Sequence, residues 1–321
     1  MIINYKRNHW VILIAAVLAG GGFATDSTEE YLNSQLQGTN LYNPAWAGIA
    51  SALLPGAGQF YTKKYFKAGT FVALEAITAS IASHHYKNYR SLYDSYKNMQ
   101  SGVSDAKSPL DSAILREDAL LEYGNARESK IHMYNTLSWM VGGYLFNVLD
   151  AVNSTSFFDN SDTKDPRVAA WLAAIPGLGL GHLYNGSLSK AGFVIMTQVS
   201  LGVVAYNNHK LMREAEDNIS RFIKMEKKVI KEKEDLETDI DKKSIVENVL
   251  SESYKDEWEF RQNSAFRNRN TYLWYSIFFY IYGILDAVVD AHLHDYREKM
   301  KLYPDLVPAN DGAHLQINYK F

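Results

Sequence analysis

Two carboxylates and an imidazole recur on one face of the last long apolar segment. Asp286, Asp290 and His294 are spaced at i, i+4 and i+8, which places them on one side of a helix. Such a set could bind a divalent cation, although it is a weak candidate for a metal site. The favoured interpretation is a polar stripe at a membrane boundary that makes caps and salt bridges to Arg297 or Lys299, because intramolecular pairing is commoner.

Other polar side chains interrupt the apolar runs. Glu75 lies in FVALEAITA and aligns with Gln198 in VIMTQVS, and Asp150 aligns with Asp286. A carboxylate inside a membrane segment is costly and usually faces a protein partner or water. We expect Glu75 to hydrogen-bond Asp150 or a tyrosine, and the alternative is a role in ion or proton movement. The candidate intramembrane polar residues are Glu75, Gln198, Asp150, Asp286 and Asp290.

Motifs of the common enzyme classes are missing from the sequence. It contains no GxxxxGK[ST] loop, no GxSxG elbow and no HExxH, and the glycines at 177, 179 and 181 do not fit GxGxxG. There is no cysteine, which excludes disulfides and thiol chemistry. The net charge of -3 gives no general attraction to nucleic acid. We therefore expect no enzymatic activity, no cofactor and no nucleic-acid partner.

The N-terminus has the three parts of a secretory signal. Lys6 and Arg7 precede an apolar run from Trp10 to Leu18, and small residues follow up to Ala24. The run is shorter than the roughly 20 residues that span a bilayer. We expect a signal peptide over residues 1–24, and an uncleaved anchor is the alternative. The mature chain would then begin outside the cytoplasm.

The elements that must position the polar residues are written twice. PGAGQFYTKKYFKAG (55–69) returns as PGLGLGHLYNGSLSKAG (176–192), with two extra residues in the glycine stretch. YLFNVLDAV (144–152) likewise returns as YIYGILDAV (280–288). Two matches in the same order indicate a tandem duplication. The motif residues, which we expect to serve turning and packing, are Pro55, Gly56, Gly58, Gln59, Tyr61, Gly69, Pro176, Gly177, Gly181, Tyr184 and Gly192.

The duplication predicts the organisation of the chain. We expect a first membrane repeat over 42–160, a second over 161–300, and a tail over 301–321. The repeated tyrosine would anchor at a membrane interface, and the basic cluster at 63–67 could contact anionic lipid headgroups. The predicted fold is all-α, with four to six membrane segments at about 45–61, 68–83, 133–152, 167–184, 191–206 and 271–292.

The number of spans stays open at this stage. If all six segments cross, the copies are inverted, and the positive-inside rule favours this arrangement with the basic turn in the cytoplasm. If the two Pro-led segments are re-entrant, four spans remain and the copies are parallel. A soluble helical protein with buried helices is the remaining alternative.

Each repeat carries a long polar insert. The insert over 85–131 has a helical pattern broken around SGVSDAKSPLDS, and the insert over 207–270 is densely charged, with a helical stripe and a break near DIDKKS. The second insert is expected to be an antiparallel helical hairpin. Its charges are expected to be a solvated face, and a partner-binding coiled coil is the sharper hypothesis. The tail ends in HLQINYKF, whose alternation predicts a short strand.

PGAGQFY…KAG together with LDAVVDAHLHDY resembles a family of uncharacterised bacterial envelope proteins, a domain of unknown function related to the small two-transmembrane-helix domain. The resemblance covers roughly residues 44–300. Thr62-Lys63 departs from the Asn-Gly of the family pattern, His182 stands where glutamine is usual, and Tyr296-Arg297 replaces Phe-Asp. The matching residues are Pro55, Gly56, Gly58, Gln59, Tyr61, Lys67, Gly69, Leu285, Asp286, Ala287, Val288, Asp290, Ala291, His292 and Leu293.

The resemblance implies a membrane protein of the bacterial cell envelope and supplies no activity. We therefore expect a non-enzymatic integral membrane protein, with the inner membrane favoured. It would be a structural or scaffold component that contacts membrane lipids, binds a protein partner through the 207–270 hairpin, and could form an oligomer. The alternative is a small transporter or channel that uses Glu75, Asp150, Asp286 and Asp290.

Overall fold

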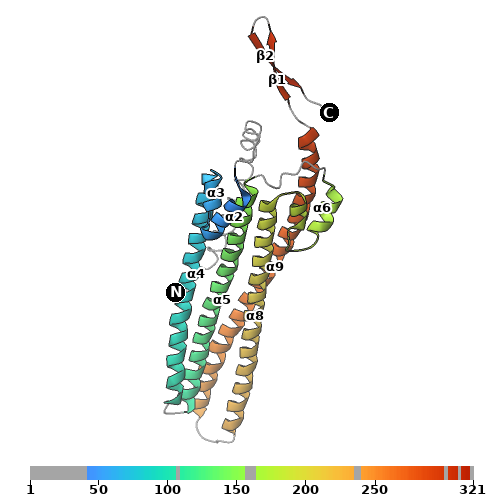
Figure 1. Cartoon of the computed structure of the whole chain (residues 1–321). Coiled ribbons are helices and arrows are strands. Elements are labelled where there is room, and N and C mark those ends of the chain that lie inside the picture. Colours follow the sequence, from blue (N-terminus) through green and yellow to red (C-terminus); the bar gives the residue numbers. More distant parts are fainter. Residues whose placement is uncertain are drawn as a thin grey trace. The chain divides into compact units, whose positions relative to one another are not determined.

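A computed structural model gives the fold of the chain (Figure 1). It describes residues 42–105, 109–155, 164–234, 240–299, 303–309 and 312–318, with side chains for 42–105, 112, 114–155, 164–224 and 254–293. The expected signal peptide over 1–24 lies outside these residues. The elements in chain order are α2 (Pro44–Leu53), α3 (Ala57–Tyr61), α4 (Tyr65–Ser104), α5 (Pro109–Asn153), α6 (Pro166–Ala173), α7 (Leu180–Tyr184), α8 (Leu188–Glu234), α9 (Ile240–Lys299), β1 (Tyr303–Ala309) and β2 (Gly312–Asn318).

Short helices replace the two Pro-led apolar segments. The segment expected at 45–61 is divided into α2 and α3, and the segment at 167–184 is divided into α6 and α7. In each case a proline occupies the first helical turn and the preceding Asn43 or Asp165 caps it through its side chain. The break falls at the PGxG motif, where Gly56 and Gly179 have φ of 80° and 59°.

Long helices carry the apolar segments directly into the polar inserts. Helix α4 runs without a break from the apolar 68–83 segment into the first insert, and α8 does the same for the second. In the first insert α4 ends at Ser104 and α5 begins at Pro109, and in the second α8 ends at Glu234 and α9 begins at Ile240. Both inserts are therefore helical hairpins, close to the expected breaks.

The chain forms two compact units that cut across the two repeats. Unit 1 comprises the described residues within Met1–Leu74, Gly142–Gln198 and Ile277–Phe321, and unit 2 comprises Glu75–Val141 and Val199–Ser276. Each of α4, α5, α8 and α9 contributes residues to both units.

Unit 1 has an interior of aromatic, small and polar side chains. Phe71, Phe146, Phe193 and Phe279, one from each long helix, form a chain of edge-on contacts with ring centroids 5.3, 6.0 and 6.5 Å apart. Large apolar side chains face outward instead. The buried polar residues of this unit include Ser51, Gln59, Asn147, Asp150, His182, Asn185, Ser189 and Thr197.

Unit 2 is a bundle of the four insert helix segments, coloured cyan, green, yellow and orange in Figure 1. Its interior has a more conventional composition, because Ile131, Phe222 and Trp258 are all buried in it. Phe222 of α8 packs with Tyr254 of α9 in a core cluster. The second insert, expected to be an antiparallel helical hairpin, thus packs against the first.

The tail is an antiparallel β-hairpin. Strands β1 and β2 pair with Leu306 opposite Leu315 and Val307 opposite His314. The alternating pattern near the C-terminus predicted a single short strand, and the structure adds a preceding partner. The predicted strand's last residues, 319–321, lie outside the described part.

Two helices in the described part of the chain are long and apolar enough to cross a membrane. They span Leu188–Lys224 within α8 and Tyr254–Leu293 within α9. Half of the most apolar window of the α8 span is buried, but only 11% of that of the α9 span. The apolar side chains of α9 therefore face largely outward.

Lys63 occupies a backbone conformation that favours glycine. Its φ is 62°, and the matching position of the second repeat is Gly186, with φ of 82°. We expect Lys63→Gly to raise the free energy of unfolding by roughly 0.5–1 kcal/mol, because left-handed φ costs a Cβ-bearing residue about 1–2 kcal/mol and glycine's freedom in the unfolded chain returns part of it. Thermal denaturation measures this. Lys64→Gly, the control at an ordinary φ, should lower stability, and a lower melting temperature for Lys63→Gly would contradict the prediction.

Candidate functional site

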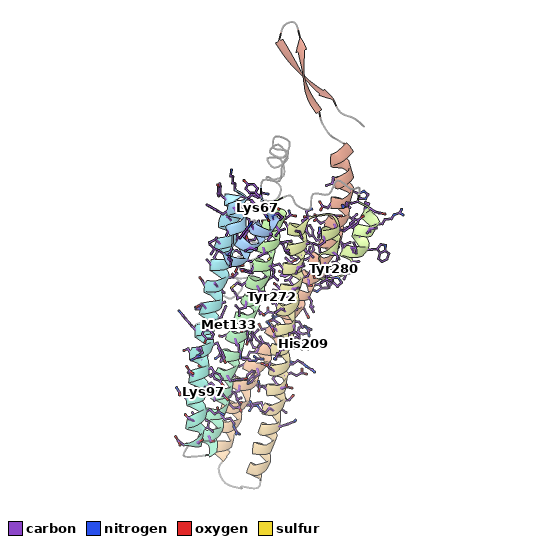
Figure 2. All side chains as sticks on the ribbon, in the orientation of Figure 1. Lys67, Lys97, Met133, His209, Tyr272 and Tyr280 are labelled. Atoms are coloured by element: carbon purple, nitrogen blue, oxygen red, sulfur yellow. The ribbon has the colours of Figure 1, made fainter. Side chains whose placement is uncertain are left out.

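The first polar cluster surrounds Asp150 of α5, which is completely buried in unit 1. Gln59 of α3 donates from Nε2 to Asp150 Oδ2 at 3.1 Å and to the Asn147 carbonyl oxygen at 2.9 Å. Its Oε1 accepts a hydrogen bond from Ser51 Oγ at 3.0 Å. Lys67 of α4, labelled in Figure 2, places Nζ 3.6 Å from Asp150 Oδ1. The cluster joins α2, α3, α4 and α5 through hydrogen bonds and one buried ion pair.

The second polar cluster surrounds Asp286 of α9. Lys190 Nζ of α8 lies 3.2 Å from Asp286 Oδ2 and 3.0 Å from Asp290 Oδ1. His182 of α7 is 2% exposed, and its Nδ1 lies 3.7 Å from Asp286 Oδ2. The His182 ring also hydrogen-bonds the Gly283 carbonyl group. This cluster is less buried than the first, because Asp286 is 25% exposed and Lys190 39% exposed.

The two clusters are built from the same repeat positions. Each takes one residue from the short helix after the PGxG break, the lysine of Lys-Ala-Gly, and the aspartate of Leu-Asp-Ala-Val. The matched pairs are Gln59 with His182, Lys67 with Lys190, and Asp150 with Asp286. The motif residues of each repeat, distant in sequence, therefore meet at one place in unit 1.

The glycine next to each cluster has no room for a side chain, and the surroundings of Gly58 are the tighter. A Cβ on Gly58 would lie 2.2 Å from the Ala47 carbonyl oxygen and 2.6 Å from Ala151 Cβ. A Cβ on Gly181 would lie 2.7 Å from the Ala169 carbonyl oxygen and 3.0 Å from Ala287 Cβ. Helices therefore touch backbone to backbone at both positions, which only glycine permits.

A further equivalence fixes the register of the break. A Cβ on Gly56 would lie 2.5 Å from the Ala68 carbonyl oxygen, and one on Gly179 would lie 2.8 Å from that of Ala191. Gly177 has nothing within 4 Å of such a Cβ. The structural counterpart of Gly56 is thus Gly179, although the PG dipeptides alone would align Gly56 with Gly177.

The repeated tyrosines close each repeat on itself. The Tyr61 hydroxyl oxygen accepts from the backbone N–H of Asn43 at 3.3 Å, and that of Tyr184 accepts from Asp165 at 3.0 Å. These tyrosines, expected to be interfacial anchors, also hold the start of the preceding short helix. A second matched pair of tyrosines binds the C-terminal ends of the same short helices. The Tyr144 hydroxyl group donates to the Ala52 carbonyl oxygen, and the hydroxyl group of Tyr280, labelled in Figure 2, donates to the Ala174 carbonyl oxygen.

A direct link joins the two repeats. Ser189 Oγ, at the start of α8, donates to Asp150 Oδ1 at 2.7 Å. The next hydrogen bond along runs from the Leu188 N–H to Asn153 Oδ1 at 2.9 Å. The end of α5 therefore caps the beginning of α8, and Asp150 serves both repeats.

The remaining residues singled out from the sequence lie elsewhere. Glu75 Oε1 is buried and has no hydrogen-bond partner among the described residues. The expected bond to Asp150 is not seen there, and Asp150 instead contacts Gln59, Ser189 and Lys67. Gly69 is open to added volume, whereas a Cβ on Gly192 would lie 3.1 Å from Leu149 Cδ1. Pro55 and Pro176 lie in the turns between the short helices. Gln198 lies on α8, at the end of the Gly142–Gln198 segment of unit 1.

The weak metal candidate is not supported by the described side chains. The side chain of His294 lies outside them, as do those of Arg297 and Lys299. Among the described residues no group of three or more acidic or histidine side chains could hold a metal ion. Asp286 and Asp290 instead share Lys190, a cation that already neutralises them in part.

Several residues of the two polar clusters were not predicted from the sequence. Ser51, Asn147, Lys190 and Ser189 were not singled out, because isolated polar residues near helix ends are common and carry no motif. Asn147 precedes Asp150 by three residues, so both lie on one helix face, and this spacing is the signal that could have found it.

Unit 2 holds its two hairpins together through ion pairs and hydrogen bonds. Glu117 of the first hairpin is fully buried and pairs with Arg221 of the second, with Oε1 3.2 Å from Nη1. Tyr254 donates to Asp118 Oδ1 at 2.6 Å. Glu214, Arg221 and Arg261 of the second insert therefore bind the first insert, where a solvated face was expected.

A pocket of about 370 Å³ lies on unit 2 between α5, α8 and α9. Four of its charged groups form ion pairs: Arg127 with Glu214, and Arg261 with Glu257. The hydrogen bond to Glu214 raises the pKa of Arg127. The pocket wall includes Phe260, which is 62% exposed, so the pocket presents an aromatic surface beside these two ion pairs.

The contact between Arg127 and Glu214 should stabilise unit 2 measurably. Arg127 donates from Nε and Nη2 to Glu214 at 2.7–3.0 Å. We expect Arg127→Glu to cost about 1.5–3 kcal/mol, because charge-assisted hydrogen bonds are lost and two carboxylates then oppose each other. The double variant with Glu214→Arg should recover part of this loss. A double-mutant cycle in chemical denaturation measures the coupling, and additive losses would contradict the contact.

Comparisons with known proteins add one finding. A sequence model of a family of unknown function (DUF5683) matches the chain twice, at residues 40–165 and 162–321. Searches of curated proteins and of solved structures found no match. The two matched ranges cover both polar clusters and nearly the whole chain from residue 40, and the chain therefore belongs to this family of unknown function.

Proposed function

We propose that the chain is a non-enzymatic integral membrane protein of the bacterial cell envelope. Unit 1 and the adjoining apolar turns of α4, α5, α8 and α9 would lie in the bilayer, and the polar ends of the two inserts would lie in water. The observation that supports this is the reversed distribution of side chains in unit 1. Asp150 and Gln59 are completely buried, whereas Leu53 is 81% exposed, Trp171 79% and Phe66 76%. Polar groups inside and large apolar groups outside suit a lipid environment, where small residues bring helices together.

Unit 2 shows the opposite arrangement. Its interior contains Ile131, Phe222 and Trp258, and its ion pairs are partly exposed. Such a bundle gains the hydrophobic stabilisation that water provides. Because α4, α5, α8 and α9 continue from one unit into the other, the same helices would pass from lipid to water.

Four spans fit the lengths of the helices better than six. Helix α2 has 10 residues and α6 has 8, so at 1.5 Å per residue neither approaches the roughly 30 Å of a hydrocarbon core. The long helices have 40 residues or more. The short helices α2, α3, α6 and α7 would therefore enter one leaflet and return.

The contacts between the inserts support the same topology independently. Glu117 and Arg127 of the first insert pair with Arg221 and Glu214 of the second, so both inserts must lie on the same side of the membrane. An even number of crossings must then separate them. Helices α5 and α8 supply two, and a crossing by α6 and α7 would make three. The two repeats are thus parallel.

The matched clusters favour a tandem duplication as the origin of the chain. The pairs Gly58 with Gly181 and Tyr61 with Tyr184 make the same contacts in their own repeats. In a duplicated parallel arrangement, both copies would use the lysine–aspartate pair to fasten the short helices to the long ones. The two copies would form one structure rather than separate domains, because each unit draws on both.

Fractionation and cysteine labelling test this proposal. The chain contains no cysteine, so single cysteines at the exposed positions Gln100, Lys224 and Arg167 report without background. We expect the protein to stay with membranes in carbonate, with positions 100 and 224 on one side and 167 on the other. Release by carbonate would overturn the membrane assignment, and opposite sides for 100 and 224 would overturn the four-span topology. The cysteine-free chain is the labelling control.

The expected signal peptide also sets the orientation. Whether it is cleaved or kept as an anchor, the residues that follow it would be exported. Four spans would then put the polar ends of both inserts in the cytoplasm and the basic turn at 63–67 outside. The positive-inside rule favours the reverse for this turn. An impermeant thiol reagent applied to intact cells should label Arg167→Cys and leave Gln100→Cys unlabelled.

A role as an interaction scaffold would fall to unit 2. The exposed Phe260 beside the pocket is the aromatic residue best placed to contact a partner protein. Crosslinking in cells followed by detergent extraction should identify partners that Phe260→Ala loses. Phe266→Ala is the matched control, because Phe266 lies on the same helix outside the pocket lining. An unchanged partner set for Phe260→Ala would reject this surface.

Transport is the second candidate function, and one observation favours it. Glu75 Oε1 is buried without a hydrogen-bond partner among the described residues, in the apolar part of α4. A carboxylate so placed could carry a proton or cation. Proteoliposomes should then show a flux that Glu75→Gln abolishes, and a flux equal to that of empty vesicles would reject transport.

A further inference from the structure

Gln59 performs two donations with one amide group. Its Nε2 carries two hydrogens, which go to the Asn147 carbonyl oxygen and to Asp150 Oδ2. Asn147 and Asp150 are three residues apart on α5. The amide therefore fixes α3 to the backbone and to the carboxylate of the same helix at once.

His182 faces the same two groups in the second repeat. The positions matching Asn147 and Asp150 are Gly283 and Asp286 of α9. The imidazole ring hydrogen-bonds the Gly283 carbonyl group, and its Nδ1 lies 3.7 Å from Asp286 Oδ2. Nδ1 is buried and has no hydrogen-bond partner among the described residues, so the nitrogen bonded to Gly283 is Nε2.

A neutral imidazole cannot repeat what the glutamine does. It carries one N–H, which the Gly283 carbonyl takes, and its other nitrogen presents a lone pair toward a carboxylate. Only the imidazolium has a second N–H. We propose that His182 is a proton-binding site of the second repeat, at which protonation of Nδ1 creates the donor to Asp286 that Gln59 provides permanently to Asp150.

The charges around the ring decide what proton uptake does. Lys190 of α8 and the two carboxylates of α9, Asp286 and Asp290, are the titratable groups that face it. A proton on Nδ1 competes with Lys190 for Asp286, whose Oδ2 lies 3.2 Å from the lysine Nζ. Lys190 keeps Asp290, so the second carboxylate lets the cluster rearrange without leaving the lysine unpaired.

Burial lowers the pKa of His182, and the attraction of Asp286 offsets only part of this effect. The ring is therefore neutral at pH 7. With the folded-state pKa below the unfolded value, the unfolded chain takes up the proton first, and stability falls as the pH drops below about 6.5. The contribution of the neutral His182 ring to folding stability is fully present above that pH.

The two repeats provide matched variants for a test, because the residue natural to one copy, Gln59 or His182, can be placed at the equivalent position of the other. The full chain is purified in detergent, or in buffer if it proves soluble, and melted between pH 7.5 and 5.0. We expect His182→Gln to weaken the acid loss, shifting its melting temperature relative to the natural chain by roughly 2–5 °C per pKa unit. Gln59→His should deepen the acid loss. The remaining histidines and carboxylates titrate in every variant and cancel in the differences.

Two results would overturn the proposal. One is a melting-temperature difference between the natural chain and His182→Gln that stays constant with pH. The other, decisive if His182→Gln does not fold, is a Gln59→His variant whose acid loss equals that of the natural chain. Nitrogen-15 spectra of histidine-labelled natural protein give a direct reading: we expect one ring with the Nε2–H tautomer at pH 7.5 that gains an Nδ1 proton in acid. Because the bonding lies within unit 1, membrane fractionation can fail without affecting this test.

Discussion

Asp150→Ala is expected to lose about 3–5 kcal/mol of stability, enough to prevent recovery of folded protein. Asp150 is completely buried and accepts from Gln59 Nε2 and Ser189 Oγ, with Lys67 Nζ at 3.6 Å from the same carboxylate. Its removal leaves a cation and two hydrogen-bond donors without this acceptor in a buried environment. The yield of monodisperse protein after detergent extraction measures the effect.

The second repeat offers the matched control. Asp286→Ala removes the equivalent carboxylate, but Asp286 is 25% exposed and Lys190 retains Asp290. We expect a clearly smaller loss, of roughly 1–2 kcal/mol, because water reaches this cluster. Equal losses at the two positions would show that the burial and the sharing of Asp150 do not matter.

Gly58→Ala is the second substitution expected to be severe. The added methyl group would lie 2.2 Å from the Ala47 carbonyl oxygen and 2.6 Å from both Ala151 Cβ and Ser51 Oγ. Backbone atoms cannot yield as a flexible side chain can, so α2 and α3 must move apart, at a cost of about 3 kcal/mol or more. The shift would also break the hydrogen bond from the Gly58 N–H to Ser51 Oγ.

Gly69→Ala is its control within the same motif. No atom lies within 4 Å of a Cβ at this helical position, so alanine should be neutral or stabilise by up to about 1 kcal/mol. Melting temperatures of the two variants should therefore move in opposite directions. A Gly58→Ala chain as stable as the Gly69→Ala chain would contradict the backbone contact between α2 and α3.

The sequence predicted the apolar segments and the helical inserts more readily than the short helices. Apolar periodicity extends over many residues in α4 and α8, so its signal is strong. The PGxG motif predicted a break. That the break divides each apolar segment into two short helices depends on the close contact of Gly56 and Gly179 with the carbonyl groups of Ala68 and Ala191. These contacts belong to the tertiary structure and leave no local pattern.

The packing of the inserts was beyond the sequence for a similar reason. Charge-rich helices look alike whether their charges meet water or a neighbouring helix. Glu117 and Arg221 are separated by 104 positions, and the periodicity of neither insert indicates its partner. The contacts between the inserts support the proposed four spans over six, a choice that hydropathy alone left open.

The pairing of the inserts also bears on how the chain is made. Tyr254, the hydrogen-bond partner of Asp118, lies 136 residues later in the chain. At the usual synthesis rate of 5–20 residues per second, the ribosome adds those residues in about 7–27 seconds. During that interval the first hairpin has no complete partner hairpin, and Glu117 has no Arg221 until 104 further residues have been made. The nascent chain thus passes through a stage in which half of a bundle is presented to chaperones and proteases, and a pause in translation before α9 would lengthen that exposure.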